Sequence, residues 1–161
     1  MNMRRDLNKW MVILIIAAIV VAAVLFVIIP NLPQSTTNVR LGDGIFRAQV
    51  AQTDFSREKG LSGVPSLSPD QALLMIFPVA DKWPIWMKDM KVPIDIIWLD
   101  GNKKVVYIVK NAEPPGDSTP QTFTPRTSAK YVIELPAGTV SSKAITSDSV
   151  ASFQFDEGGV K

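Results

Sequence analysis

An unbroken apolar run near the N-terminus constrains this chain more than any other feature. The run extends from Met11 to Ile29 and contains 19 residues, which would form an α-helix about 29 Å long. The hydrocarbon core of a bilayer is about 30 Å thick, so the run predicts a transmembrane anchor. A signal peptide is the alternative, but its apolar region covers only about 7–15 residues. We therefore expect an uncleaved anchor at 11–29, with the membrane lipid bilayer as its partner.

The distribution of charge predicts how such an anchor would be oriented. Arg4, Arg5 and Lys9 precede the run together with a single acid, Asp6, and the positive-inside rule places this end in the cytoplasm. Of the 17 basic and 15 acidic residues in the chain, 14 of each kind follow the run. The predicted location is therefore the cell membrane, single-pass, with a neutral extracytoplasmic domain. A neutral domain without a Lys/Arg cluster is not expected to bind nucleic acid.

Cysteine and histidine are absent from the sequence. Their absence excludes disulfides, the common zinc sites, and the Ser-His-Asp and Cys-His nucleophile pairs. Met75, Met87 and Met90 offer thioether sulfur, which suits Cu(I), but methionine more often fills gaps in a core. We expect no metal, no cofactor and no catalytic constellation.

Composition divides the chain into five segments. The expected order is a basic N-terminus (1–10), the anchor (11–29), a proline-rich polar linker or stalk (30–42), a β-domain (43–156) and a frayed tail (157–161). Within the β-domain, short apolar or alternating segments bounded by turn residues predict about seven strands. These segments are 45–53, 73–78, 85–90, 94–99, 104–110, 131–136 and 149–155.

Turn and cap residues place the remaining elements. Thr53 or Asp54 can cap a short helix that ends at Gly60, and 137–145 predicts a second short helix. A hairpin turn at 100–102 predicts antiparallel pairing of the strands on either side, whereas 111–128, with four prolines, predicts a long surface loop. The expected fold is mainly β, a sandwich or partly closed barrel of about seven short strands with one or two short helices, preceded by one transmembrane helix.

Four motifs occur in order along this predicted domain. They are Arg57-Glu58-Lys59-Gly60-Leu61, then Phe77-Pro78, then Trp86-Met87-Lys88 with Val92-Pro93-Ile94-Asp95, and finally the run YVIELPAGT at 131–139. Together they resemble the family called domain of unknown function 192, with departures at Asp89, where asparagine is usual, and at Ser62-Gly63, where Met-Phe is common. The resemblance implies a mainly β, sandwich-like domain and no established activity.

Four residues stand out as a candidate ligand-binding site: Arg57, Trp86, Lys88 and Asp95. A strand at 94–99 would turn the Asp95 carboxyl group toward apolar neighbours. It could bind a ligand beside Lys88, or accept backbone N–H bonds and fix the strand entry. Lys88 could lie along Trp86 at a pocket mouth or be an exposed edge-strand charge. Arg57 could clamp an anion or pair with a neighbouring acid.

Three functional hypotheses remain open from the sequence. The first is a non-enzymatic binding or accessory module of the cell envelope, with an envelope polysaccharide, a peptide or a membrane protein as partner. The second is an envelope polysaccharide-processing enzyme that uses Asp95 with Glu134, the secondary candidate, and requires carboxyl groups about 5–9.5 Å apart. The third is a structural subunit of a membrane complex, marked by an exposed apolar patch.

Overall fold

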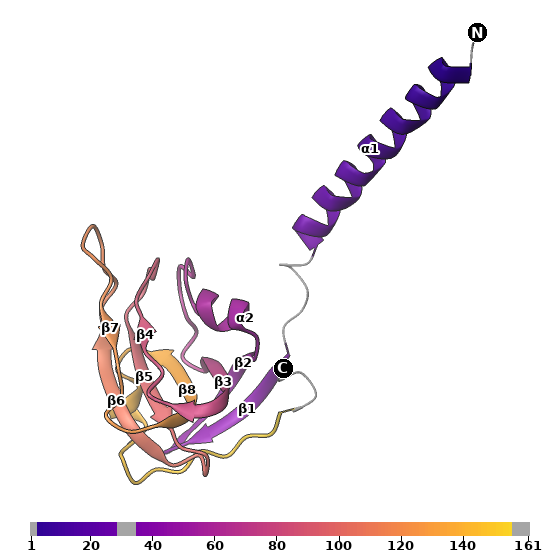
Figure 1. Cartoon of the computed structure of the whole chain (residues 1–161). Helices are drawn as coiled ribbons and strands as arrows, with labels where there is room; N and C mark the ends of the chain where they lie inside the picture. Colours follow the sequence, from indigo (N-terminus) through magenta and orange to yellow (C-terminus); the bar gives the residue numbers. More distant parts are fainter. Residues whose placement is uncertain (1–2, 29–34, 156–161) are drawn as a thin grey trace. The chain divides into compact units, whose positions relative to one another are not determined.

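The computed structural model describes residues 3–28 and 35–155. The chain divides into two compact units, 1–33 and 34–161, which are described separately. The first unit contains α1 (Met3–Ile28), a helix of 26 residues (Figure 1). The second unit contains all the strands and two short helices, α2 (Asp54–Lys59) and α3 (Thr139–Ser142).

The expected transmembrane helix is contradicted. Among the described residues, no helix is both long enough and apolar enough to cross a membrane.

The second unit is built on one mixed six-stranded sheet, so the predicted sandwich or barrel was wrong. The strand order is β1-β2-β3-β8-β5-β6, and every neighbouring pair is antiparallel except β2 and β3, which are parallel. A parallel pair needs a crossover connection, and α2 lies within it (Figure 1). The strands are β1 (Thr36–Leu41), β2 (Gly44–Ala51), β3 (Gln71–Asp81), β5 (Ile94–Leu99), β6 (Val105–Ala112) and β8 (Ala129–Pro136).

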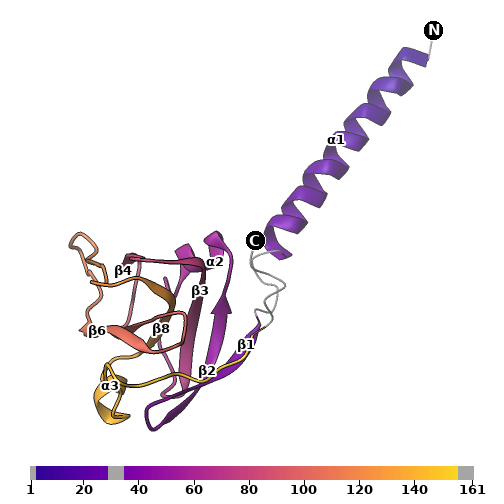
Figure 2. The same ribbon diagram turned by 60° about the horizontal axis from the view of Figure 1, so that its bottom comes forward.

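A second, two-stranded sheet pairs β4 (Ile85–Trp86) with β7 (Thr122–Phe123). The strand expected at 85–90 is therefore only two residues long, and the positive φ of Asp89, 56°, is incompatible with a continuing strand. β7 lies inside the segment that was expected to be wholly loop. Figure 2 shows α2 and α3 toward opposite ends of the unit, with the strands between them.

The two ends of the domain also differ from expectation. β1 occupies part of the predicted linker, whose residues 30–34 lie outside the described range, as does the predicted tail at 157–161. The predicted last strand, 149–155, forms only two isolated bridges, Arg40 with Ser152 and Lys104 with Val150. Its backbone still completes the β1 edge, because Arg40 and Ser152 exchange two N–H···O bonds of 2.9 Å.

The core lies on both faces of the main sheet. On β5, Ile97 and Leu99 belong to one buried cluster, and Ile94, Ile96 and Trp98 belong to the other. This is the alternation predicted for 94–99, and it means that the strand is covered on both sides.

The predicted hairpin between β5 and β6 is confirmed as an antiparallel pair, and its turn contains the predicted residues 100–102 and extends to Lys103. Asp100 Oδ1 accepts the N–H groups of Asn102 at 2.8 Å and Lys104 at 2.9 Å. The residue with positive φ is Lys103, not glycine or asparagine.

Candidate functional site

Glu134 is the least expected polar side chain in the domain. It lies on β8 between Leu73 of β3 and Ile96 of β5, on the face that carries the cluster containing Trp98. Only 3% of the residue is exposed, and its Oε2 atom is buried with no hydrogen-bond partner among the described residues. Burial raises the pKa of Glu134 from 4.5 to about 8, because an apolar environment disfavours the charged form. At neutral pH the group is an uncharged acid that can donate a hydrogen bond.

A cavity of about 30 Å³ leads to this carboxyl group. One water molecule needs about 10–15 Å³ measured in this way, so the space admits a group of about two water-sized atoms. Glu134 shares the walls with apolar side chains from three segments of the chain. These are Leu61, Met75, Pro84, Ile85 and Met90.

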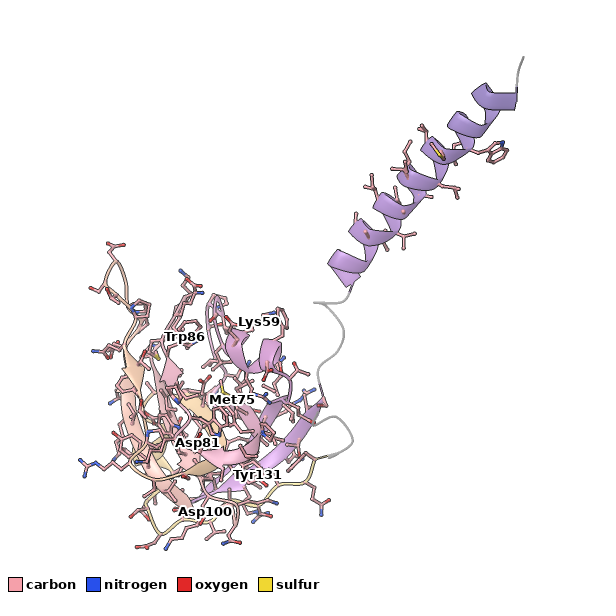
Figure 3. The ribbon with its side chains drawn as sticks, in the orientation of Figure 1. Lys59, Met75, Asp81, Trp86, Asp100 and Tyr131 are labelled. Atoms are coloured by element: carbon pink, nitrogen blue, oxygen red, sulfur yellow. The ribbon has the colours of Figure 1, made fainter. Side chains whose placement is uncertain are left out.

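A larger groove of about 270 Å³ adjoins the cavity. Glu58, Lys59, Ser62 and Trp86 line both, and Phe55, Lys88 and Asp89 complete the groove. Figure 3 shows Lys59 and Trp86 toward one end of the domain, with Met75 below them in this view. The groove therefore lies between α2 and the β4 segment.

The groove walls combine exposed aromatic rings with charges of both signs. Phe55 is 67% exposed and Trp86 is 42% exposed. Lys88 Nζ lies 4.9 Å from the centre of the Trp86 ring, a cation–π distance. Lys59 and Lys88 are balanced by Glu58 and Asp89, so the groove is polar without a net charge.

Local structure holds the two walls together. The capping box between Thr53 and Ser56 fixes the start of α2. Beyond the helix, Ser62 Oγ donates to the carbonyl oxygen of Lys88 at 2.8 Å, and Gly63 N–H donates to that of Asp89 at 2.9 Å. These contacts join the segment after α2 directly to the segment after β4.

Gly60 leaves space at the inner end of the groove. A Cβ atom at this position would lie 3.4 Å from Met75 Cε and 4.0 Å from Glu134 Oε2, and φ is +49°. The positive φ favours glycine, whereas both distances are ordinary van der Waals contacts.

Arg57 does not face the groove. Its Nη1 atom donates to the carbonyl oxygens of Gln52 and, at 2.7 Å, of Ile76, and its Nη2 atom pairs with Asp54. The guanidinium also lies 5.2 Å from the centre of the Phe77 ring. Of the two interpretations, local pairing agrees with this geometry, and Arg57 ties α2 to β3.

Asp95 is fully buried and is not part of the groove or cavity lining. Its Oδ1 atom accepts the N–H of Asn111 at 2.8 Å, and its Oδ2 atom accepts that of Val140 at 2.7 Å. Val140 lies in the first turn of α3, whose N-cap residue, Gly138, has no side chain to offer. Asp95, on β5, therefore caps the start of α3 through its bond to Val140. Its bond to Asn111 also links β5 to β6.

Strand register separates the two carboxyl groups of the enzyme hypothesis. Asp95 pairs with Leu135, and its neighbour Ile96 pairs with Glu134. Successive side chains on a strand point to opposite faces, so Asp95 and Glu134 lie on opposite faces of the sheet. They do not form the catalytic pair that the hypothesis required.

Of the five predicted residues, the structure brings together Trp86, Lys88 and Glu134. Sequence reasoning missed the other groove and cavity residues, Phe55, Glu58, Lys59, Ser62, Met75 and Met90, as a set. Gly60 was noted as a helix stop, but its position beside Glu134 follows from the fold, so no sequence signal would have identified these residues as a set.

Fold and site together define a structural class: a small, mainly β domain with a ligand-sized groove that ends at a buried, unpaired carboxyl group. Residues 37–153 match the model of the DUF192 family, described as Uncharacterized ACR, COG1430. The chain belongs to this family, which confirms the resemblance predicted from the motifs.

Two archaeal relatives named UPF0127 protein support the assignment. The one from Thermococcus sibiricus is 34% identical over 96 residues, covering 58% of this chain and 57% of the relative. The one from Thermococcus gammatolerans is 31% identical over 111 residues, covering 68% and 67%. The match thus spans little more than half the length of the first relative.

Two crystal structures have the same fold. Protein R01717 from Sinorhizobium meliloti 1021, provisionally described as a transcription regulator, superposes with a TM-score of 0.71 at 24% identity, covering 76% of this chain and 96% of its own. A protein of unknown function from Novosphingobium aromaticivorans superposes with a TM-score of 0.64 at 24% identity, covering 73% and 83%. At this identity the likeness concerns the fold alone.

Proposed function

We propose that this protein is a non-enzymatic binding module that holds a small polar ligand in the groove between α2 and β4, with one hydrogen-bond acceptor of the ligand reaching Glu134. The observation that carries the proposal is the buried, unpartnered Oε2 atom at the end of a cavity. Buried polar groups in proteins are nearly always hydrogen-bonded. A group without a protein partner is therefore a place where water or a ligand belongs.

The energetics favour a ligand that supplies an acceptor. Leaving a buried polar group unsatisfied costs about 1–3 kcal/mol, and this cost is recovered when a partner enters the cavity. A cavity of about 30 Å³ admits one or two waters in the free protein, and a ligand group of similar size would replace them. The exposed faces of Trp86 and Phe55 would cover the rest of the ligand.

Methionine methyl groups provide a direct test in the full chain. Met75 and Met90 line the cavity, whereas Met87 is buried in the same cluster without lining it. We expect some members of a panel of small amides, sugars and amino acids to shift the ¹³C-methyl NMR signals of Met75 and Met90. The Met87 signal should stay in place, and Met75→Leu and Met90→Leu would assign the two signals.

The Met87 signal separates entry into the cavity from a general effect on the fold. Equal shifts of all three signals would mean that the probe perturbs the whole core. A panel in which no member moves Met75 or Met90 at millimolar concentration would contradict the proposal.

An extracytoplasmic location of the domain stays a separate prediction, made from the apolar run at 11–29 together with the basic residues that precede it. A reporter that fluoresces only in the cytoplasm, fused after Lys161, should remain dark in cells. Fluorescence equal to that of a cytoplasmic control would overturn this prediction, and it would leave the proposed binding function untouched.

A further inference from the structure

We propose that the cavity at Glu134 receives the methyl group and the carbonyl oxygen at the end of the acetamido group of an N-acetylated sugar, whose ring lies against Trp86. This inference rests on the proposed function and names the class of ligand that the groove takes.

The cavity wall matches an acetyl group. Five lining residues are apolar, namely Leu61, Met75, Pro84, Ile85 and Met90, and the polar group buried among them is the Glu134 carboxyl. An acetyl group has the same division, because its methyl is apolar and its carbonyl oxygen accepts one hydrogen bond. An uncharged Glu134 donates such a bond. The other polar lining residues, Glu58, Lys59 and Ser62, are shared with the groove.

The rim of the groove favours a sugar over an acetylated peptide. Trp86 is half-exposed at the point where cavity and groove meet, and an indole ring offers a large rigid apolar face with little loss of side-chain entropy. Lys88 Nζ lies 4.9 Å from the centre of that ring, which places a donor where ring hydroxyls would lie. The groove volume of about 270 Å³ is near the lower end of about 300–1,000 Å³ for small-molecule sites, which suits a single sugar unit.

The charges around the groove favour a neutral ligand. Lys59 and Lys88 donate hydrogen bonds, and Glu58 and Asp89 accept them. A hydroxyl group can do either, so a neutral sugar can satisfy all four residues. A phosphate or carboxylate would gain from the lysines and lose an equal amount to the acids.

The full-length chain with ¹³C-methyl methionine provides the test, using four named probes. N-acetylglucosamine should shift the Met75 and Met90 signals, and glucose and glucosamine should bind at least about tenfold more weakly, a factor that corresponds to one lost hydrogen bond. N-acetylglycine methylamide, which carries the same acetyl group without a sugar ring, should also bind at least about tenfold more weakly. Equal affinity for glucose and N-acetylglucosamine, or for the two acetylated probes, would overturn the inference.

Two substitutions at Glu134 distinguish the contribution of its hydrogen-bond donor to ligand binding from the contribution of its shape. Glu134→Leu removes the donor and should weaken binding of N-acetylglucosamine at least about tenfold, whereas Glu134→Gln keeps a neutral N–H donor and should stay within about threefold of the parent chain. Val150→Ser, at an exposed apolar residue outside the groove, is the matched control and should bind like the parent. Equal losses in Glu134→Leu and Glu134→Gln, with both variants folded by circular dichroism, would contradict the role of the donor.

Failure of this inference can be told apart from failure of the proposed function. If other probes of the panel shift the Met75 and Met90 signals but N-acetylglucosamine does not, the assignment of an N-acetylated sugar is contradicted. The proposed binding pocket is then still supported. If no probe shifts either signal, both the sugar assignment and the proposed binding function are contradicted.

Discussion

Glu134→Gln is expected to stabilise the domain at pH 8–9 by about 3–5 kcal/mol while changing stability little near pH 4.5. The pKa of Glu134 rises from 4.5 to about 8 on burial, so between these values the folded state holds a proton that the unfolded chain has released. The free energy of unfolding of the parent therefore falls as pH rises from about 4.5 to 8, at about 1.4 kcal/mol per pH unit at most. Glutamine does not titrate and should remove this slope, as urea unfolding at several pH values would show.

The composition makes this pH profile easy to interpret. The chain has no histidine, the side chain that would ordinarily titrate between pH 5 and 8. Glu113→Gln, at an exposed glutamate directly after β6 and outside the cavity lining, is the control and should keep the slope of the parent. A parent whose stability is flat or rising between pH 5 and 8 would show that Glu134 is charged in the folded state.

Asp95→Ala is expected to destabilise the domain by about 3–5 kcal/mol. The substitution leaves the part-buried N–H of Asn111 and the buried N–H of Val140 without their acceptor, and an orphaned buried donor costs about 1–3 kcal/mol. Asp95→Asn should rescue only part of the loss, because an amide offers one oxygen and turns an NH₂ group toward the second donor. Urea unfolding would report the loss as a lower midpoint at an unchanged slope.

Asp117→Asn is the matched control for Asp95, because Asp117 lies exposed in the loop before β7. It should change stability by less than about 0.5 kcal/mol, as surface substitutions usually do. If Asp95→Ala unfolded at the same urea concentration as this control, Asp95 would not be the residue that ties β5 to β6 and α3.

The sequence alone predicted the features that depend on local pattern. The apolar segment 94–99 predicted β5 and the division of its side chains between two faces. Thr53 and Asp54 predicted a capped start for α2, and Thr53 is the cap. One of the two interpretations of Asp95, acceptance of backbone N–H bonds, agrees with the structure. The second donor, on α3, could not have been predicted because it lies 45 residues away along the chain.

The features that were missed depend on pairing between distant segments. The sheet is mixed because β2 and β3 pair in parallel. No local sequence pattern distinguishes a chain that forms this sheet from one that forms a sandwich. The Glu134 side chain is surrounded by apolar neighbours because Glu134 pairs with Leu73 on one side and with Ile96 on the other. The same register places Asp95 on the opposite face of the sheet. Trp86 and Lys88 were candidates from their motif, but the groove also needs Phe55 and Lys59 of the α2 segment, whose proximity is set by the Ser62–Lys88 hydrogen bond.

The central claim is that an uncharged Glu134 ends a pocket that a ligand can reach. A ¹³C NMR titration of the Glu134 side-chain carboxyl group tests it most directly, first in the free full-length chain and then with the panel member that shifts Met75 and Met90 most. The account predicts a midpoint near pH 8 that moves higher when the ligand binds, because the ligand accepts a hydrogen bond from the protonated form. A midpoint near the ordinary value of about 4.3 for glutamate, or one that the bound ligand leaves unchanged, would contradict the account.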